Sequence, residues 1–302
     1  RPVVALDAAA AMVALARESE PDVPGVQADL EALPFRRGGL GGAWARASYL
    51  HIPRRRLPCA LMQLHQALAV GAPAHLTMLH GDDEGPFPDD DFPGRFFARW
   101  QPDALCDVLV GAGFDVVDTI ADDAGWIHAL VRRARTLPDF VGPGMRLLVC
   151  GLNPSLRAAD AGVGFVTPGN RFWPAAIDAG IVTRDRDPVN ALTGHGIGMT
   201  DLVKHATARA DELTRDEYRA GAARVERLVA WLQPGAICFV GLAGYRAAVD
   251  RKAKAGLQPA AFGGVPAYVM PNTSGLNARV PLPELAQHLR EAVWYSDPCT
   301  AR

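Results

Sequence analysis

The sequence lacks the features that define several large protein classes. No apolar stretch among its 302 residues is as long as a membrane-spanning helix, and no signal peptide is visible. We therefore expect no membrane partner. The chain begins with Arg rather than Met, which predicts a fragment or a processed chain. Hydrophobic residues make up 49% and charged residues 21% of the chain, as is typical of a soluble globular protein.

The cysteines are few and scattered, with no CxxC motif: Cys59, Cys106, Cys150, Cys238 and Cys299. This spacing argues against a zinc site and against a disulfide framework. An iron–sulfur cluster would need four thiolates in a usable arrangement, so we expect no metal. The acidic stretch 82–91 offers carboxylates for a cation, but its spacing matches no calcium loop, which favours a solvated loop.

Charge is unevenly divided along the chain. Residues 1–140 hold 13 Lys and Arg against 19 Asp and Glu, a net charge of −6. Residues 141–302 hold 18 against 14, a net charge of +4. The basic second half is in the direction expected for a phosphate-rich partner, although on charge alone ordinary scatter is the preferred explanation.

Apolar runs alternate with amphipathic segments, which predicts an α/β protein. In the first half we expect strands at 3–7, 25–29, 43–51, 74–80 and 114–117, and helices at 8–17, 58–70 and 103–112. In the second half we expect strands at 146–150, 236–241 and 267–270, a strand or tight turn at 198–203, and helices at 171–179, 215–232, 245–249 and 282–294. A capping box, Thr214 to Glu217, begins the long helix.

A Pro- and Gly-containing stretch at 132–144 predicts a linker between two domains, residues 1–135 and 136–302. Each domain is expected to be a three-layer αβα fold around a mainly parallel sheet. In the second domain, the strand at 146–150 ends in Gly-Leu-Asn-Pro-Ser, and the strand at 267–270 ends in Pro-Asn-Thr-Ser-Gly-Leu-Asn. Open α/β sheets bind ligands at such carboxyl ends, so we expect the two loops to face one site.

Four motifs occur in order: Gly-Leu-Asn-Pro-Ser at 151–155, Pro-Gly-Asn-Arg-Phe-Trp at 168–173, Gly-Ile-Gly-Met-Thr-Asp-Leu-Val at 196–203 and Pro-Asn-Thr-Ser-Gly-Leu-Asn at 271–277. Together they resemble the mismatch-specific uracil/thymine-DNA glycosylase family of the uracil-DNA glycosylase superfamily, over residues 141–296. The resemblance implies a cofactor-free, monomeric hydrolase that flips uracil out of DNA, for instance from G:U mismatches. The abundance of Ala, Arg and Gly indicates a GC-rich bacterial source, in which such a repair enzyme is expected in the cytoplasm, on the nucleoid.

The resemblance assigns roles to residues of the first motifs. Asn153 corresponds to the residue that positions the attacking water, whereas read alone it is a turn-forming residue. Phe165 lies where the family stacks an aromatic ring on the flipped base. The alternative is that Phe165 is a buried residue of the core. The remaining residues expected to hold the substrate or its loop are Gly151, Leu152, Asn170 and Thr200. We expect Phe172 and Trp173 to lie in the core. Arg171 is expected to fix the geometry of the loop or to contact a phosphate.

The last motif resembles the family's wedge loop, which enters the base stack. Its residues here are Asn272, Ser274, Gly275, Leu276, Asn277 and Arg279, with Thr273 where relatives often have Pro. Asp201 departs from the family's usual Asn or Lys. Its carboxylate could activate water, accept from a base edge, or serve as a turn residue. No lysine is placed as a nucleophile, since Lys204 is expected to point away, and this predicts a monofunctional enzyme.

Residues 1–120 resemble a truncated class I S-adenosylmethionine-dependent methyltransferase, through the segments 4–7, 26–35 and 50–53. In that family Asp7 would hold the ribose and Asp29 would lie near the adenine, with helix-cap or surface roles as the alternatives. The family's first strand and glycine-rich turn are absent, so cofactor binding is not expected. Two other functions remain open: a methyltransferase with a nucleic-acid-binding second domain, and an inactive DNA-binding scaffold.

Overall fold

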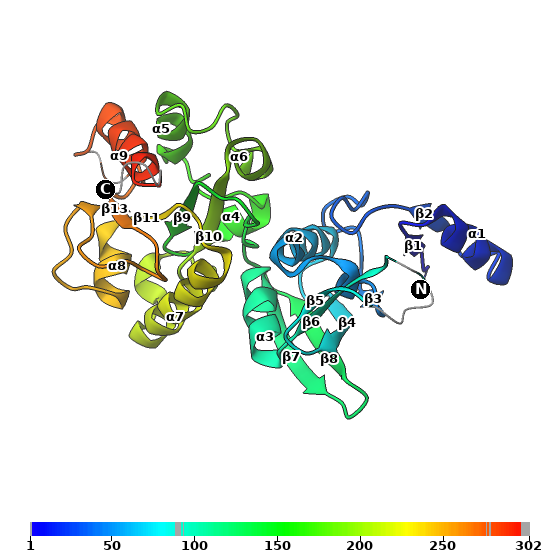
Figure 1. Ribbon diagram of the computed structural model, residues 1–302. Helices are drawn as coiled ribbons and strands as arrows, with labels where there is room; N and C mark the ends of the chain where they lie inside the picture. The colour runs from blue at the N-terminus through cyan, green and yellow to red at the C-terminus, as the bar shows by residue number, and fades with distance from the viewer. Residues whose placement is uncertain (1, 88–91, 93, 276, 278, 297–302) are drawn as a thin grey trace.

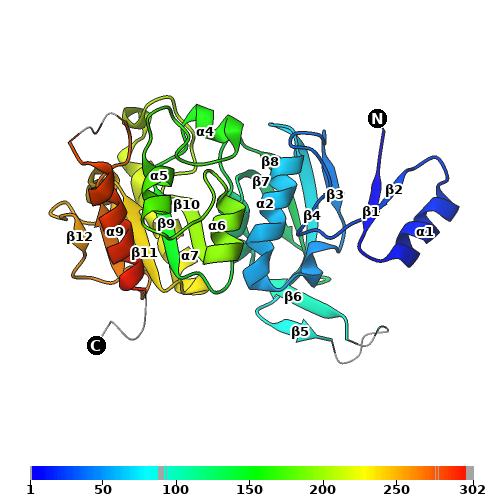
Figure 2. The same cartoon turned by 90° about the horizontal axis from the view of Figure 1, so that it is seen from above.

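The computed structural model describes residues 2–87, 92, 94–275, 277 and 279–296, and Figures 1 and 2 show its arrangement. Its strands form three sheets of two, six and five strands, most of them paired in parallel, with helices between them in sequence. This confirms the predicted α/β class. Within the described residues, no helix is both long and apolar enough to span a lipid bilayer.

The chain begins with a small separate unit. β1 (Ala5–Asp7) and β2 (Gly25–Gln27) pair in parallel, and α1 (Ala10–Ser19) connects them and packs on them. Both views show this unit at one end of the molecule, apart from the other sheets. No described strand joins β1 or β2 to the six-stranded sheet.

The six-stranded sheet is mixed and centres on β4 (Pro73–His80), which pairs with β8 along one edge and with β3 and β6 along the other. Two helices, α2 (Leu57–Ala67) and α3 (Pro102–Gly111), share one apolar cluster with the sheet and cover one of its faces. Its other strands are β3 (Ala43–Ala45), β5 (Glu84–Pro86), β6 (Phe96–Trp100), β7 (Phe114–Ala121) and β8 (Trp126–Arg133). The sequence analysis missed β5, β6 and β8. Two short 3₁₀ turns, Tyr49–His51 and Arg54–Arg56, precede α2.

The five-stranded sheet has the order β10-β9-β11-β13-β12, in which all neighbours but β12 are parallel. Its strands are β9 (Leu147–Gly151), β10 (Ile197–Asp201), β11 (Ala236–Val240), β12 (Gly256–Leu257) and β13 (Ala267–Met270). Its helices are α4 (Leu156–Ala161), α5 (Phe172–Asp178), α6 (Pro188–His195), α7 (Arg215–Leu232), α8 (Leu242–Ala248) and α9 (Leu282–Trp294). The predicted capping box is formed at the start of α7, whereas α4 and α6 were not predicted.

Helices cover both faces of this sheet (Figure 1). Alternate strand residues face two cores: Leu147 and Val149 pack with α5, α6 and α9, whereas Leu148 and Cys150 pack with α7 and α8. Burial on both faces explains the continuous apolar runs in the sequence.

The predicted linker at 132–144 is not an exposed connection. β8 extends through Arg133, and Leu137, Phe140 and Val141 are each at most 3% exposed. Phe140 pairs through its backbone with Met199 of β10. Proline and glycine in this stretch suggested a loose segment, but its apolar side chains bury it against the five-stranded sheet.

Candidate active site

The predicted site residues gather at the carboxyl edge of the five-stranded sheet. β9 and β10 are neighbours, and their register places Asp201 opposite Gly151. Asn153 lies two residues after the end of β9, and the loop after β13 begins at Pro271. Parallel strands end at the same edge, which is why motifs far apart in the sequence converge here.

The side-chain amide of Asn153 is held in one orientation. Its Nδ2 donates to the Thr207 hydroxyl at 2.8 Å and to the His205 carbonyl at 2.9 Å. No described residue donates to its Oδ1. This amide therefore offers a free acceptor oxygen at the end of β9, which is suited to orienting a water molecule.

Gly151 allows two other predicted residues to approach each other. A Cβ at this position would lie 2.6 Å from Asp201 Oδ1 and 3.5 Å from Phe165 Cζ, so a side chain would displace the carboxylate. The Phe165 ring stacks on Phe172, with centroids 4.1 Å apart and planes at 22°. Phe165 has a positive φ of 59°, a left-handed conformation that its surroundings must enforce.

Asp201 has an unusual ionisation. Burial raises its pKa to about 6, an effect that Asp139 reinforces and that Lys204 and Arg224 oppose. The carboxyl therefore changes charge close to neutral pH, unlike an ordinary aspartate. A group of this kind beside a candidate site is suited to coupling proton uptake to binding or chemistry.

A buried charged cluster lies behind Asp201 and is centred on Asp139, which is 2% exposed. Asp139 accepts from Lys204 Nζ and Arg224 Nη1, both at 2.8 Å, and from the Thr200 hydroxyl at 2.6 Å. Burial by itself raises the pKa of Asp139, but Arg224 and Lys204 outweigh it and hold the pKa below its ordinary value. Arg224 Nη2 also donates to the Asp201 carbonyl at 2.9 Å. Thr200 and Lys204 thus point into this cluster.

The loop after β13 is tied to the motif at 168–173. A Cβ on Gly275 would lie 2.9 Å from the Gly169 carbonyl oxygen, so the two backbones touch. Asn170 Oδ1 accepts from the Thr273 hydroxyl at 3.1 Å and from the Phe172 amide at 2.9 Å. Arg171 donates to the carbonyls of Asn277 and Val280, so its guanidinium fixes loop geometry.

The rest of this loop is held by its own asparagines. Asn272 Oδ1 accepts from the Ser274 amide, and Asn277 Nδ2 donates to the Asn272 carbonyl, both at 2.8 Å. Arg279 is exposed. Leu276 lies outside the described residues.

Other predicted residues lie away from this cluster. The Leu152 side chain packs with the core of α7 and α8. Asp7 Oδ1 accepts from the Ala9 amide at 2.8 Å, and Asp29 Oδ1 from the Glu31 amide at 2.9 Å. Both acids are exposed and cap their own turns. In the described residues no three His, Cys, Asp or Glu side chains are grouped to hold a metal ion.

A protein-family model for the uracil DNA glycosylase superfamily matches residues 138–294. The match spans more than half of the chain and contains Gly151, Asn153, Phe165, Asp201 and the loop after β13. The chain belongs to the uracil DNA glycosylase superfamily. This membership supports a DNA glycosylase, a hydrolase of DNA repair that acts on DNA and whose reaction needs no cofactor.

The N-terminal region of this superfamily member is similar to solved S-adenosylmethionine-dependent methyltransferases. One from Mesorhizobium loti is 19% identical over 43% of this chain and 80% of its own, with a TM-score of 0.38. One from Methanosarcina mazei is 10% identical over the same shares, with a TM-score of 0.37. The [4+2]-cyclase SpnF is 16% identical, with 43% of this chain matching 65% of that protein at a TM-score of 0.36.

Sequence reasoning missed two residues that hydrogen-bond to residues of the candidate active site. Thr207 and Asp139 lie 54 and 62 positions from Asn153 and Asp201, respectively, and neither belongs to a motif. The apolar neighbours of Asp139 in the supposed linker were the only local signal that this acid is buried. Phe172 and Trp173 are buried as expected.

Proposed function

We propose that this chain is a monofunctional glycosylase that excises uracil from DNA, with G:U mismatches as its substrate class. The fixed amide of Asn153 is the observation that carries the proposal. With Nδ2 engaged by Thr207 and the His205 carbonyl, Oδ1 is free to align water for attack on the sugar. Catalysis of this kind relies on positioning more than on covalent chemistry.

We propose that the flipped base occupies the space beside Gly151. The Phe165 ring, already supported from behind by Phe172, would stack on the base, and stacking contributes about 1–3 kcal/mol per base. Asp201, whose carboxylate adjoins Gly151, would face the base edge. A protonated Asp201 donates to a base oxygen, whereas the ionised form opposes the negative charge that develops on departing uracil.

The loop after β13 would supply the wedge, with Leu276 entering the stack and Asn277 and Arg279 contacting DNA. Its rigidity comes from Arg171, Asn170 and the Gly169–Gly275 contact, which stand in for the proline that relatives carry. Preorganisation of this kind lowers the entropic cost of base flipping. Lys204 is bound to Asp139, which supports a water-dependent mechanism over a lysine-dependent one.

We propose a two-domain monomer, divided near residues 135 and 136, that works in the bacterial cytoplasm on the nucleoid. S-adenosylmethionine has no part in the proposal, because the residues present do not fit it: Asp7 and Asp29, which would contact the ribose and adenine, instead accept from amides of their own turns.

The test is excision from a duplex with a single G:U pair, followed by alkali to break the chain at abasic sites. We expect the wild type to cleave only after alkali. Asn153→Ala should bind the duplex normally and excise at least about 100-fold more slowly, because the water is no longer aligned. Asn190→Ala, the same change in α6, is the matched control and should keep full activity. An inactive wild type that still binds DNA would instead identify a scaffold.

A further inference from the structure

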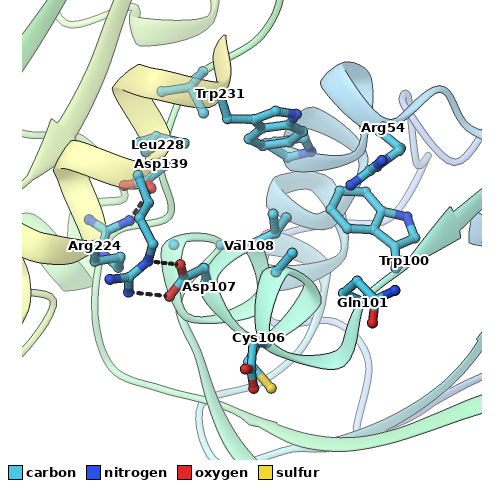
Figure 3. A pocket seen from close by; sticks show the side chains of 17 residues that line it. Arg54, Trp100, Gln101, Cys106, Asp107, Val108, Asp139, Arg224, Leu228 and Trp231 are labelled. Atoms are coloured by element: carbon cyan, nitrogen blue, oxygen red, sulfur yellow. Dashed lines mark hydrogen bonds and ion pairs between the residues drawn. The ribbon is translucent and has the colours of Figure 1, made fainter. Parts of the chain in front are cut away.

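A large cavity lies between α3 and α7, and the Asp139–Arg224 ion pair behind Asp201 is part of its lining (Figure 3). Its volume is about 780 Å³, within the range of small-molecule sites. Trp100, at the end of β6, and Val108 of α3 form one wall, while Leu228 and Trp231 of α7 form the other. The two indole rings meet edge to face, with centroids 5.7 Å apart and planes at 76°. The cavity is therefore built jointly by both halves of the chain.

The contacts around this cavity are close. A Cβ on Gly111 of α3 would lie 2.5 Å from Asp139 Oδ2 and 3.0 Å from Arg224 Nη1, so helix backbone rests directly on the buried ion pair. Arg227 of α7 bonds to Asp107 of α3 through both carboxylate oxygens, at 2.5 and 2.9 Å.

The charges that line the cavity favour an anion. Asp107 is neutralised by Arg227, and Asp139 by Lys204 and Arg224. The Arg54 guanidinium lies 4.8 Å from the centre of the Trp100 ring and donates to the Asp82 carbonyl. Among the described residues it has no carboxylate within ion-pair distance.

Asp103 is the remaining lining acid, and it is exposed to solvent, where water and salt screen its charge. Of the three arginines that line the cavity, Arg54 is the one without an ion-pair partner in the described residues, and the Glu84 carboxylate accepts from its backbone amide at 2.7 Å. A guanidinium over an indole is a common arrangement for binding a carboxylate next to an aromatic ring.

We propose that this cavity binds a small planar aromatic anion, whose ring packs against Val108, Leu228 and the Trp231 indole and whose acidic group pairs with Arg54. The site is separate from uracil excision, and the proposal does not depend on it. The apolar walls supply most of the affinity, and Arg54 supplies the preference for negative charge.

Three probes with one ring system test the proposal: 2-naphthoate, its neutral amide 2-naphthamide, and the cation 2-naphthylmethylammonium. Isothermal titration calorimetry with the whole chain should give saturable binding of one molecule of 2-naphthoate, at least about fivefold tighter than the amide and tighter still than the cation. Failure of all three to saturate, or equal affinity of all three, would overturn the proposal.

Variants place the binding in this cavity. Val108→Phe and Leu228→Phe each fill the space from a different wall, and either one that retains the wild-type thermal unfolding midpoint should lose binding of all three probes. Arg54→Gln should lower the affinity for 2-naphthoate to that for 2-naphthamide and leave the affinity for 2-naphthamide unchanged. Arg56→Gln, in the same arginine triplet but outside the cavity, is the matched control and should match the wild type. Unchanged binding in the filled variants would place the ligand elsewhere and refute the site.

Discussion

The two larger sheets of this protein bury their side chains differently. Every residue of β9, β11 and β13 is buried, because helices lie on both faces of the five-stranded sheet. In the six-stranded sheet, β8 alternates between buried and more exposed positions, since α2 and α3 cover one face only. Val117, Ile120 and Leu130 are consequently 38–55% exposed on the uncovered side.

This difference shows that the burial of a sheet is reflected in the hydrophobic pattern of its strand sequences. A strand covered on both faces needs a continuous apolar run, whereas one covered on a single face alternates. The covered sheet also carries the candidate active site at its carboxyl edge, on a support with little freedom to move. The half-covered sheet contributes instead to the cavity beside α3.

The largest effect is expected where the two regions meet, at Asp139. Asp139→Ala leaves Lys204 and Arg224 without their buried carboxylate and should lower the free energy of unfolding by about 3–5 kcal/mol. Because the pKa of Asp139 is held below its ordinary value, its contribution is present at neutral pH and is lost as pH falls through that lowered pKa. Urea titrations at several pH values measure both effects.

Asp115→Ala, an exposed acid on β7, is the control for that experiment and should change stability little. If Asp139→Ala and Asp115→Ala lower the free energy of unfolding equally, the charged cluster around Asp139 does not stabilise the contact between the two sheets.

A matched pair of leucines compares the two sheets directly. Leu148 in β9 is fully buried, and Leu148→Ala should cost about 2–5 kcal/mol through lost burial and a cavity. Leu130 in β8 is 38% exposed, and Leu130→Ala should cost under about 1 kcal/mol. Urea unfolding of both variants is the measurement, and equal costs would mean that the open face of the six-stranded sheet is covered in solution.

The smallest effect concerns the charge at Asp201. If its protonated form donates to the base, uracil excision should fall about tenfold for each pH unit above its pKa of about 6. Asp201→Asn removes the titration and should give a flat profile over the same range, with a changed preference among damaged bases. A wild-type rate that rises through pH 6 would assign Asp201 to water activation. If the pH profiles of the wild type and Asp201→Asn coincide, Asp201 is only a turn residue.

The sequence by itself determined the α/β class and most of the elements around the candidate site. β9, β11 and β13 follow from unbroken apolar runs, and α7 begins where Thr214 and Glu217 predict. These features depend on neighbours within a few residues, so local pattern is sufficient. The order of four motifs pointed to the superfamily that the match over residues 138–294 confirms.

Only the tertiary structure decided which distant residues meet. The register of β9 and β10 brings Asp201 against Gly151, and burial there raises the pKa of the carboxyl to about 6. The sequence placed Asp139 in a linker, whereas the structure pairs it with Lys204, in the loop after β10, and with Arg224 of α7. The cavity forms because helices more than a hundred residues apart in sequence, α3 and α7, pack side by side. Contacts of this range depend on how whole layers stack, which no local spacing encodes.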